Sequence, residues 1–183
     1  DTEELLFIGT APFDEETGEG GGDLSDIKVI DDPAPGTHSA DWKLPYGVIS
    51  FRINGLEPGA ATSVMMTTIT GGSPVAGTSY WKYGSPTPGA ADRWYKFDYD
   101  EATGTGAQLI GAIDVPGFGL RRAFQLDLRD GARGDNDGGA NGTITVTGGP
   151  VTGGDTDTPP TPPHHPQPHH PQPHRQLRHR WPQ

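Results

Sequence analysis

A glycine-rich loop in the second half of the chain gathers the residues best suited to chemistry. The stretch 126–150 reads LDLRDGARGDNDGGANGTITVTGGP, and its alternating run at 143–147 predicts a strand. Short carboxylates and amides that converge from a tight turn are the ligands that calcium prefers, and glycines supply the backbone angles of such a turn. The loop therefore predicts a calcium site with four ligands: Asp130, Asp135, Asp137 and Asn141.

The same residues allow a second interpretation of the loop. Asp and Asn side chains also accept hydrogen bonds from neighbouring backbone, which produces a solvated hairpin loop without an ion. Calcium is favoured because several carboxylates at close range repel one another unless something neutralises them. The loop is not an EF-hand, since Arg133 stands at the first ligand position and Ile144 at the closing one.

Two short motifs overlap with this loop. Residues 133–135 spell RGD, a tripeptide that integrins recognise, and residues 141–143 form an N-glycosylation sequon. Tripeptides recur by chance, and Asp135 is already a candidate metal ligand. Neither motif therefore decides the prediction.

Three further stretches, taken with the loop, point to a family. They are the run 46–59 (YGVISFRINGLEPG) and the aromatic groups 80–83 (YWKY) and 94–97 (WYKF). Together with the segment 130–144 (DGARGDNDGGANGTI), they resemble the bacterial choice-of-anchor U domain over residues 42–150. The resemblance implies an extracellular module that precedes a surface-sorting signal, with a place on the cell surface and no established chemistry.

Composition limits the class of protein. The chain has 183 residues, of which 31% are hydrophobic, with 28 glycines and 19 prolines, so one all-β domain with extended ends is expected. The absence of cysteine excludes disulfides and thiolate metal sites. The net charge of −11 disfavours nucleic acid as a partner, because phosphates would be repelled. No membrane span is predicted, since no run of about 18 apolar residues occurs.

Short alternating or β-branched runs, separated by Gly, Pro and Asn turns, predict eight or nine strands. The clearest is 46–53, whose alternation sets Ile49, Phe51 and Ile53 on one face. Others are expected at 5–8, 27–30, 62–70, 107–113, 121–128 and 143–147, and around Trp81 and Trp94. This spacing is typical of an antiparallel β-sandwich of jelly-roll or immunoglobulin-like type.

Trp81 and Trp94 each stand beside Tyr and Lys. A core this poor in hydrophobic residues needs its large aromatic side chains inside, so both are expected to be buried. The alternative is an exposed platform that stacks on sugar rings, as in a carbohydrate-binding adhesin. His38, close to Asp41, is expected to make a surface hydrogen bond rather than to bind a metal.

The chain divides into an N-terminal strand with an acidic segment (1–41), the sandwich domain (42–150) and a Gly/Thr linker with a Pro/His-rich tail (151–183). The N-terminal strand is expected at a sheet edge, or alternatively in the sheet of a neighbouring subunit. The tail is expected to be an extended spacer. Its histidine pairs at 164–165 and 169–170 could bind zinc, copper or nickel.

These observations predict a non-catalytic, calcium-stabilised β-sandwich module of a bacterial cell-surface or secreted protein, which contacts the cell envelope or matrix. The alternative is the structural subunit of an extracellular filament or pilus, a homopolymer bridged by the N-terminal strand or the C-terminal tail. No enzyme is predicted, because the sequence has no Gly-x-Ser-x-Gly elbow and His38 is the single histidine before the tail.

Overall fold

The computed structural model describes residues 6–12, 14–16, 19–38, 41–68, 78–87, 89–115 and 117–153. Within these residues it contains nine strands and no helix. The strands are β1 (Leu6–Thr10), β2 (Asp23–Ile30), β3 (Val48–Asn54), β4 (Ala61–Thr68), β5 (Ser79–Gly84), β6 (Arg93–Lys96), β7 (Gly106–Val115), β8 (Gly119–Arg129) and β9 (Ile144–Val151). Each lies where a strand was expected from the sequence.

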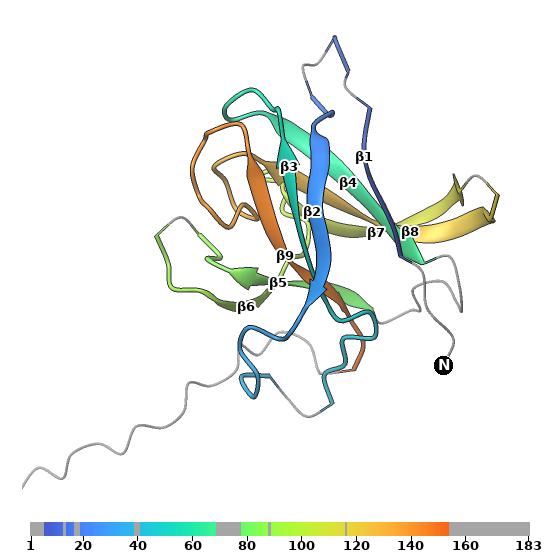
Figure 1. Ribbon diagram of the computed structural model, residues 1–183, viewed down its shortest axis with the longest axis vertical. Helices are drawn as coiled ribbons and strands as arrows, with labels where there is room; N and C mark the ends of the chain where they lie inside the picture. The colour runs from blue at the N-terminus through green and yellow to red at the C-terminus, as the bar shows by residue number, and fades with distance from the viewer. Residues whose placement is uncertain are drawn as a thin grey trace, which may run out of the picture.

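The strands form two antiparallel sheets that pack face to face (Figure 1). Sheet A has the order β1-β4-β8-β7, and sheet B has the order β2-β3-β9-β5-β6. The predicted antiparallel β-sandwich is thus confirmed. The strand order itself is new information, because neighbours in each sheet are mostly distant in the sequence.

Both strands of the segment 1–41 belong to the sandwich. β1 pairs with β4 at the edge of sheet A, and β2 pairs with β3 at the edge of sheet B. The expected edge strand is therefore found within the chain's own sheet. The tail from residue 154 onward, with its histidine pairs, lies outside the described residues.

The main core fills the space between the two sheets. Alternation in β3 places Ile49, Phe51 and Ile53 inward, as predicted. β8 does the same with Phe124, Leu126 and Leu128, while Gln125 and Asp127 point out. Because successive side chains of a strand face opposite ways, the outward set of β8 is available on the surface of sheet A.

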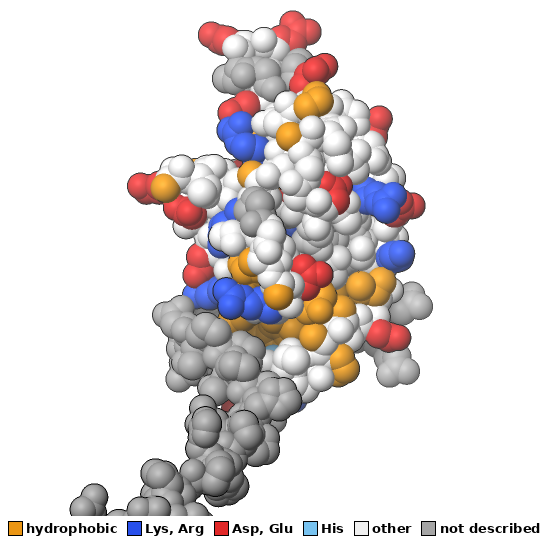
Figure 2. All heavy atoms as spheres, turned by 90° about the vertical axis from the view of Figure 1, so that its left-hand side faces the viewer, with side chains coloured by type: hydrophobic (Ala, Val, Ile, Leu, Met, Phe, Trp, Pro, Cys, Tyr) orange, Lys and Arg blue, Asp and Glu red, His pale blue; other side chains and the backbone are white. Residues whose placement is uncertain are grey.

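A second hydrophobic cluster covers the outer face of sheet B. Trp42, which precedes β3, packs edge-on against Trp94 with ring centroids 4.9 Å apart, and against Trp81 at 5.5 Å. Trp94 is only 2% exposed, whereas Trp81 stays half-buried. Trp94 is therefore buried as expected and Trp81 only partly, and both lie outside the main core. Figure 2 shows hydrophobic side chains gathered on the lower part of this side of the molecule.

Gly148 lets β9 pack closely between β3 and β5. A Cβ added there would lie 2.4 Å from the carbonyl oxygen of Trp81, which belongs to the backbone and cannot rotate away. Gly111 in β7 offers the matched comparison, because a Cβ added there meets nothing within 4 Å.

We expect Gly148→Ala to lower the free energy of unfolding by about 1–3 kcal/mol, as overpacking does. Gly111→Ala should leave it within about 0.5 kcal/mol of the parent. Urea denaturation of both variants measures the difference. Equal stability of the two would show that β5 and β9 are not held at this close distance.

Candidate functional site

The candidate site is the segment 130–143, which connects β8 in sheet A to β9 in sheet B. It closes one end of the sandwich, so its side chains can join elements from both sheets. All four predicted calcium ligands lie in it.

Asp130 links this loop to the turn between β3 and β4. Its side chain is buried at 3% exposure. Oδ2 accepts hydrogen bonds from the backbone N–H groups of Gly59, at 2.9 Å, and Gly142, at 2.8 Å. Oδ1 is buried and has no hydrogen-bond partner.

Asp135 is equally buried, at 3% exposure, and holds the loop against β9. Oδ2 accepts from Gly131 N–H at 2.9 Å, and Oδ1 accepts from Thr145 N–H at 3.0 Å and Asp137 N–H at 3.3 Å. Burial raises the pKa of the Asp135 carboxyl, and these hydrogen bonds oppose the rise.

Asp137 and Asn141 lie on the exposed side of the loop. Asp137 Oδ1 accepts from Gly139 N–H at 3.0 Å and from the Asn141 amide at 3.4 Å. Asn141 Oδ1 accepts from Thr143 N–H at 2.9 Å. These are the local side-chain to backbone bonds of an Asx-type turn.

Each of the four predicted ligands therefore already accepts at least one backbone N–H. In the part of the chain that the structure describes, no three His, Cys, Asp or Glu side chains are grouped so that they could hold a metal ion. The N–H donors supply the compensation for carboxylate repulsion that calcium was predicted to supply. This geometry supports a self-capped loop, in which the Asp and Asn side chains accept hydrogen bonds from nearby backbone without an ion. Calcium binding stays a prediction.

Lys82, which was not among the predicted site residues, is fully buried beneath the loop. Its Nζ donates to the carbonyl oxygen of Gly134 and lies 5.4 Å from the centroid of the Phe97 ring. Burial lowers the pKa of Lys82 to about 7, although the charge of Asp135 opposes this and that of Arg133 adds to it. The signal in the sequence was its spacing: Lys82 lies two residues after Tyr80 in β5, so both side chains point to the same, inward face.

Arg133, which is half-buried, has a structural role that ties down the first residue of the RGD tripeptide. Its guanidinium lies 4.6 Å from the Phe97 ring centroid and donates to the carbonyl oxygens of Asp98 and Thr105, each at 3.1 Å. A third bond goes to the carbonyl oxygen of Lys96 at 3.3 Å. With Arg133 held in this way and Asp135 buried, the tripeptide is not presented as a free loop.

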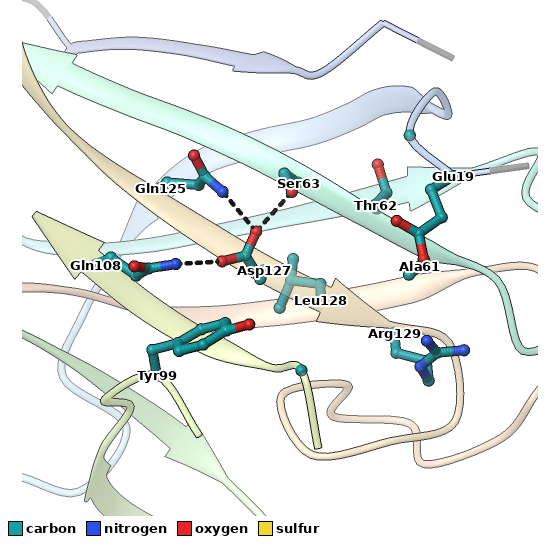
Figure 3. Close-up of a pocket in the computed structure, with 12 residues that line it drawn as sticks. Glu19, Ala61, Thr62, Ser63, Tyr99, Gln108, Gln125, Asp127, Leu128 and Arg129 are labelled. Carbon is teal, nitrogen blue, oxygen red and sulfur yellow. Dashed lines mark hydrogen bonds between the residues drawn. The ribbon is translucent and has the colours of Figure 1, made fainter. Parts of the chain in front are cut away.

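A polar groove crosses the outer face of sheet A (Figure 3). At its centre, the Asp127 carboxylate accepts from the Ser63 hydroxyl at 2.6 Å, from the Gln125 amide at 2.8 Å and from the Gln108 amide at 3.0 Å. Asp127 lies on the outward face of β8, within the stretch 121–128 that was expected to be a strand.

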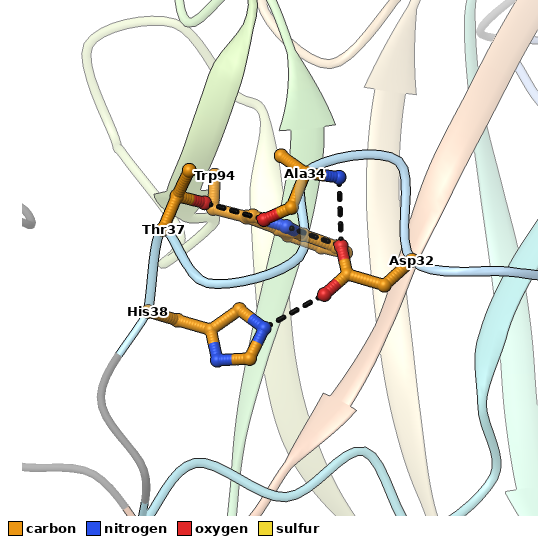
Figure 4. Close-up of polar contacts among 5 residues, drawn as sticks. All are labelled: Asp32, Ala34, Thr37, His38 and Trp94. Atoms are coloured by element: carbon orange, nitrogen blue, oxygen red, sulfur yellow. Dashed lines mark hydrogen bonds and ion pairs between the residues drawn. The ribbon is translucent and has the colours of Figure 1, made fainter.

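Asp32, in the segment between β2 and β3, connects that segment to the second hydrophobic cluster (Figure 4). Its carboxylate accepts from the Trp94 indole N–H at 3.1 Å and lies 2.7 Å from His38 Nε2. Burial opposes ionisation of Asp32, but hydrogen bonds from Ala34 N–H, His38 and Trp94 outweigh it and lower the pKa. His38 thus makes the expected side-chain hydrogen bond, but with Asp32 rather than Asp41.

Comparisons with family models, with curated proteins and with solved structures found no match to this chain. The described residues include no helix that is long and apolar enough to cross a membrane.

The buried Lys82 predicts a pH-dependent stability. In the unfolded chain its amine keeps a proton up to its usual pKa of 10.5, whereas in the folded chain it loses the proton near pH 7. Between these values the unfolded state binds more protons, so the free energy of unfolding rises with pH, by at most about 1.4 kcal/mol per unit.

Chemical denaturation from pH 7 to pH 9.5 measures this rise. Lys82→Met keeps a long buried side chain without a titrating group and should abolish the rise. Lys43→Met, on an exposed side chain, should retain it. A rise that persists unchanged in Lys82→Met would assign the pH dependence to another group.

Proposed function

We propose that this chain is a non-catalytic β-sandwich module of a bacterial cell-surface or secreted protein, whose closing loop locks the two sheets together. The observation that carries the proposal is the pair of buried carboxylates, Asp130 and Asp135. Their hydrogen bonds reach the turn before β4, the loop itself and the first residues of β9. The cellular location rests on the resemblance to the choice-of-anchor U domain.

The ionisable groups of the loop are used in ways that suit a structural role. A catalytic acid or base must reach a substrate proton at hydrogen-bond distance. Asp130, Asp135 and Lys82 are buried and bonded to backbone groups, so they face no open site. A loop built in this way supplies rigidity rather than reactivity.

This proposal makes the loop independent of calcium. The buried Oδ1 of Asp130 is the predicted ligand atom that a cation would benefit most, because no donor compensates its desolvation. The remaining loop contacts form without an ion. Calcium stabilisation is therefore the competing proposal, and both can be tested with the same variant.

The filament alternative needs β1 or the tail to bridge copies of the chain. In the structure β1 completes the chain's own sheet A, with Leu6 opposite Thr68 and Thr10 opposite Val64. This pairing favours a self-contained module. The tail that could bridge copies lies outside the described residues.

We expect Asp130→Ala to lower the melting temperature by about 5 °C or more, because two backbone N–H groups lose a charged acceptor. Under our proposal the loss is the same in millimolar calcium and in excess chelator. Asp92→Ala, at an exposed position, serves as the control and should melt like the parent.

A loss seen only in calcium would contradict the self-capped loop and establish the metal site. Light scattering in the same two buffers tests the assembly state. We expect a monodisperse monomer in both, whereas long particles in either buffer would favour the filament subunit.

A further inference from the structure

We propose that the polar groove on the outer face of sheet A is a binding site for a neutral carbohydrate. The groove has a volume of about 300 Å³, which is at the small end for ligand sites. Its position, its hydrogen-bonding groups and its one exposed aromatic ring each support this ligand class. The inference does not depend on calcium or on the proposed cellular location.

The groove has a floor and two walls from separate parts of the chain. Ser63 of β4, Asp127 of β8 and Gln108 of β7 lie across the floor, as Figure 3 shows. One wall is the segment 19–20, where Gly20 N–H donates to Ala61 O at 3.0 Å. The other wall is the turn that carries Tyr99. This turn is held to β7 by a hydrogen bond from Ala107 N–H to the carbonyl oxygen of Phe97. A solvated sheet face without walls would not form such a hollow.

The floor is preorganised by hydrogen bonds between side chains. Asp127 fixes Ser63, Gln108 and Gln125 at 2.6–3.0 Å, and side-chain to side-chain bonds of this kind are the minority in folded proteins. Each Gln amide that donates one N–H to Asp127 retains a second N–H and a carbonyl oxygen. Paired donors and acceptors match sugar hydroxyls, which both donate and accept. Fixing them in advance lowers the entropic cost of binding.

Tyr99 adds the apolar surface that a sugar ring requires. Its side chain is 41% exposed, and Figure 3 shows its ring beside Gln108 with the hydroxyl directed along the groove. An aromatic face next to a polar row complements a pyranose, which has C–H groups on its faces and hydroxyls around its rim. Tyr is suited to this position because its apolar ring ends in a polar hydroxyl.

The charge of the site selects among polyhydroxylated ligands. Asp127 lies on the floor and Glu19 lines one wall, whereas Arg129 is the one cation of the lining, so these side chains sum to one net negative charge. The whole chain adds a net charge of −11. A phosphate, sulfate or carboxylate would be repelled by these groups. An uncharged oligosaccharide avoids this repulsion, so we commit to a neutral glycan segment of one or two sugar units.

The test uses a printed panel of neutral gluco-, manno- and xylo-oligosaccharides, with sialylated and sulfated glycans for comparison. Titration calorimetry then measures the dissociation constant of the strongest neutral ligand. We expect Tyr99→Ala and Gln108→Ala each to weaken binding by about tenfold or more. Leu120→Ala, at an exposed apolar residue near the start of β8, is the control and should bind like the parent.

Two further readouts separate the groove from other sites. Side-chain amide signals of Gln108 and Gln125 should shift during an NMR titration with the same oligosaccharide, and thermal melts should show that the variants remain folded. Trp81→Ala tests the alternative platform on sheet B. The proposal is overturned if no neutral glycan binds at millimolar concentration, if binding is lost only in Trp81→Ala, or if anionic glycans bind better.

Discussion

The burial of two carboxylates is the constraint on which the closing end of the sandwich depends. A buried carboxylate without donors is expensive, so the backbone around Asp130 and Asp135 must direct N–H groups toward them. Those donors belong to segments far apart in the sequence, including Gly59 before β4 and Thr145 in β9. The position of the loop therefore also determines how the two sheets meet.

The same end of the molecule holds two cations that have opposite surroundings. Arg133 ends at the edge of the loop, where three backbone carbonyls and the Phe97 ring receive its guanidinium. Lys82 instead points into the space between the sheets, where burial lowers the pKa of its amine to about 7. A planar guanidinium presents several donors to several acceptors at once, whereas a buried lysine amine loses its proton more easily. The loop thus uses Arg133 at its edge, while Lys82 of β5 lies buried beneath it.

The two outer faces of the sandwich differ in chemistry, and this difference separates packing from recognition. On sheet B the tryptophan cluster is covered by the segment that carries Asp32, His38 and Trp42. The tryptophan rings pack against one another, so the aromatic side chains of the predicted platform mainly stabilise the fold. Sheet A leaves a polar row with one exposed tyrosine at its side. Recognition is therefore better sought on sheet A than at the tryptophans.

Strand positions and strand faces could be determined from the sequence alone, because the period of two is a local property of the backbone. The inward sets of β3 and β8 show this, and so does the concentration of Asx residues in the loop 130–143. The sequence could not show which atoms would compensate those carboxylates, since Gly59 and Thr145 approach them only after the sheets have paired. For β5, alternation shows only that Lys82 and Trp81 point to opposite faces. Which of these faces lines the main core was decided by the packing of sheet B against sheet A, because residue preference alone would place the lysine outside and the tryptophan inside. The groove was invisible for the same reason: Ser63, Gln108 and Asp127 become neighbours through sheet pairing, which depends on contacts between distant segments.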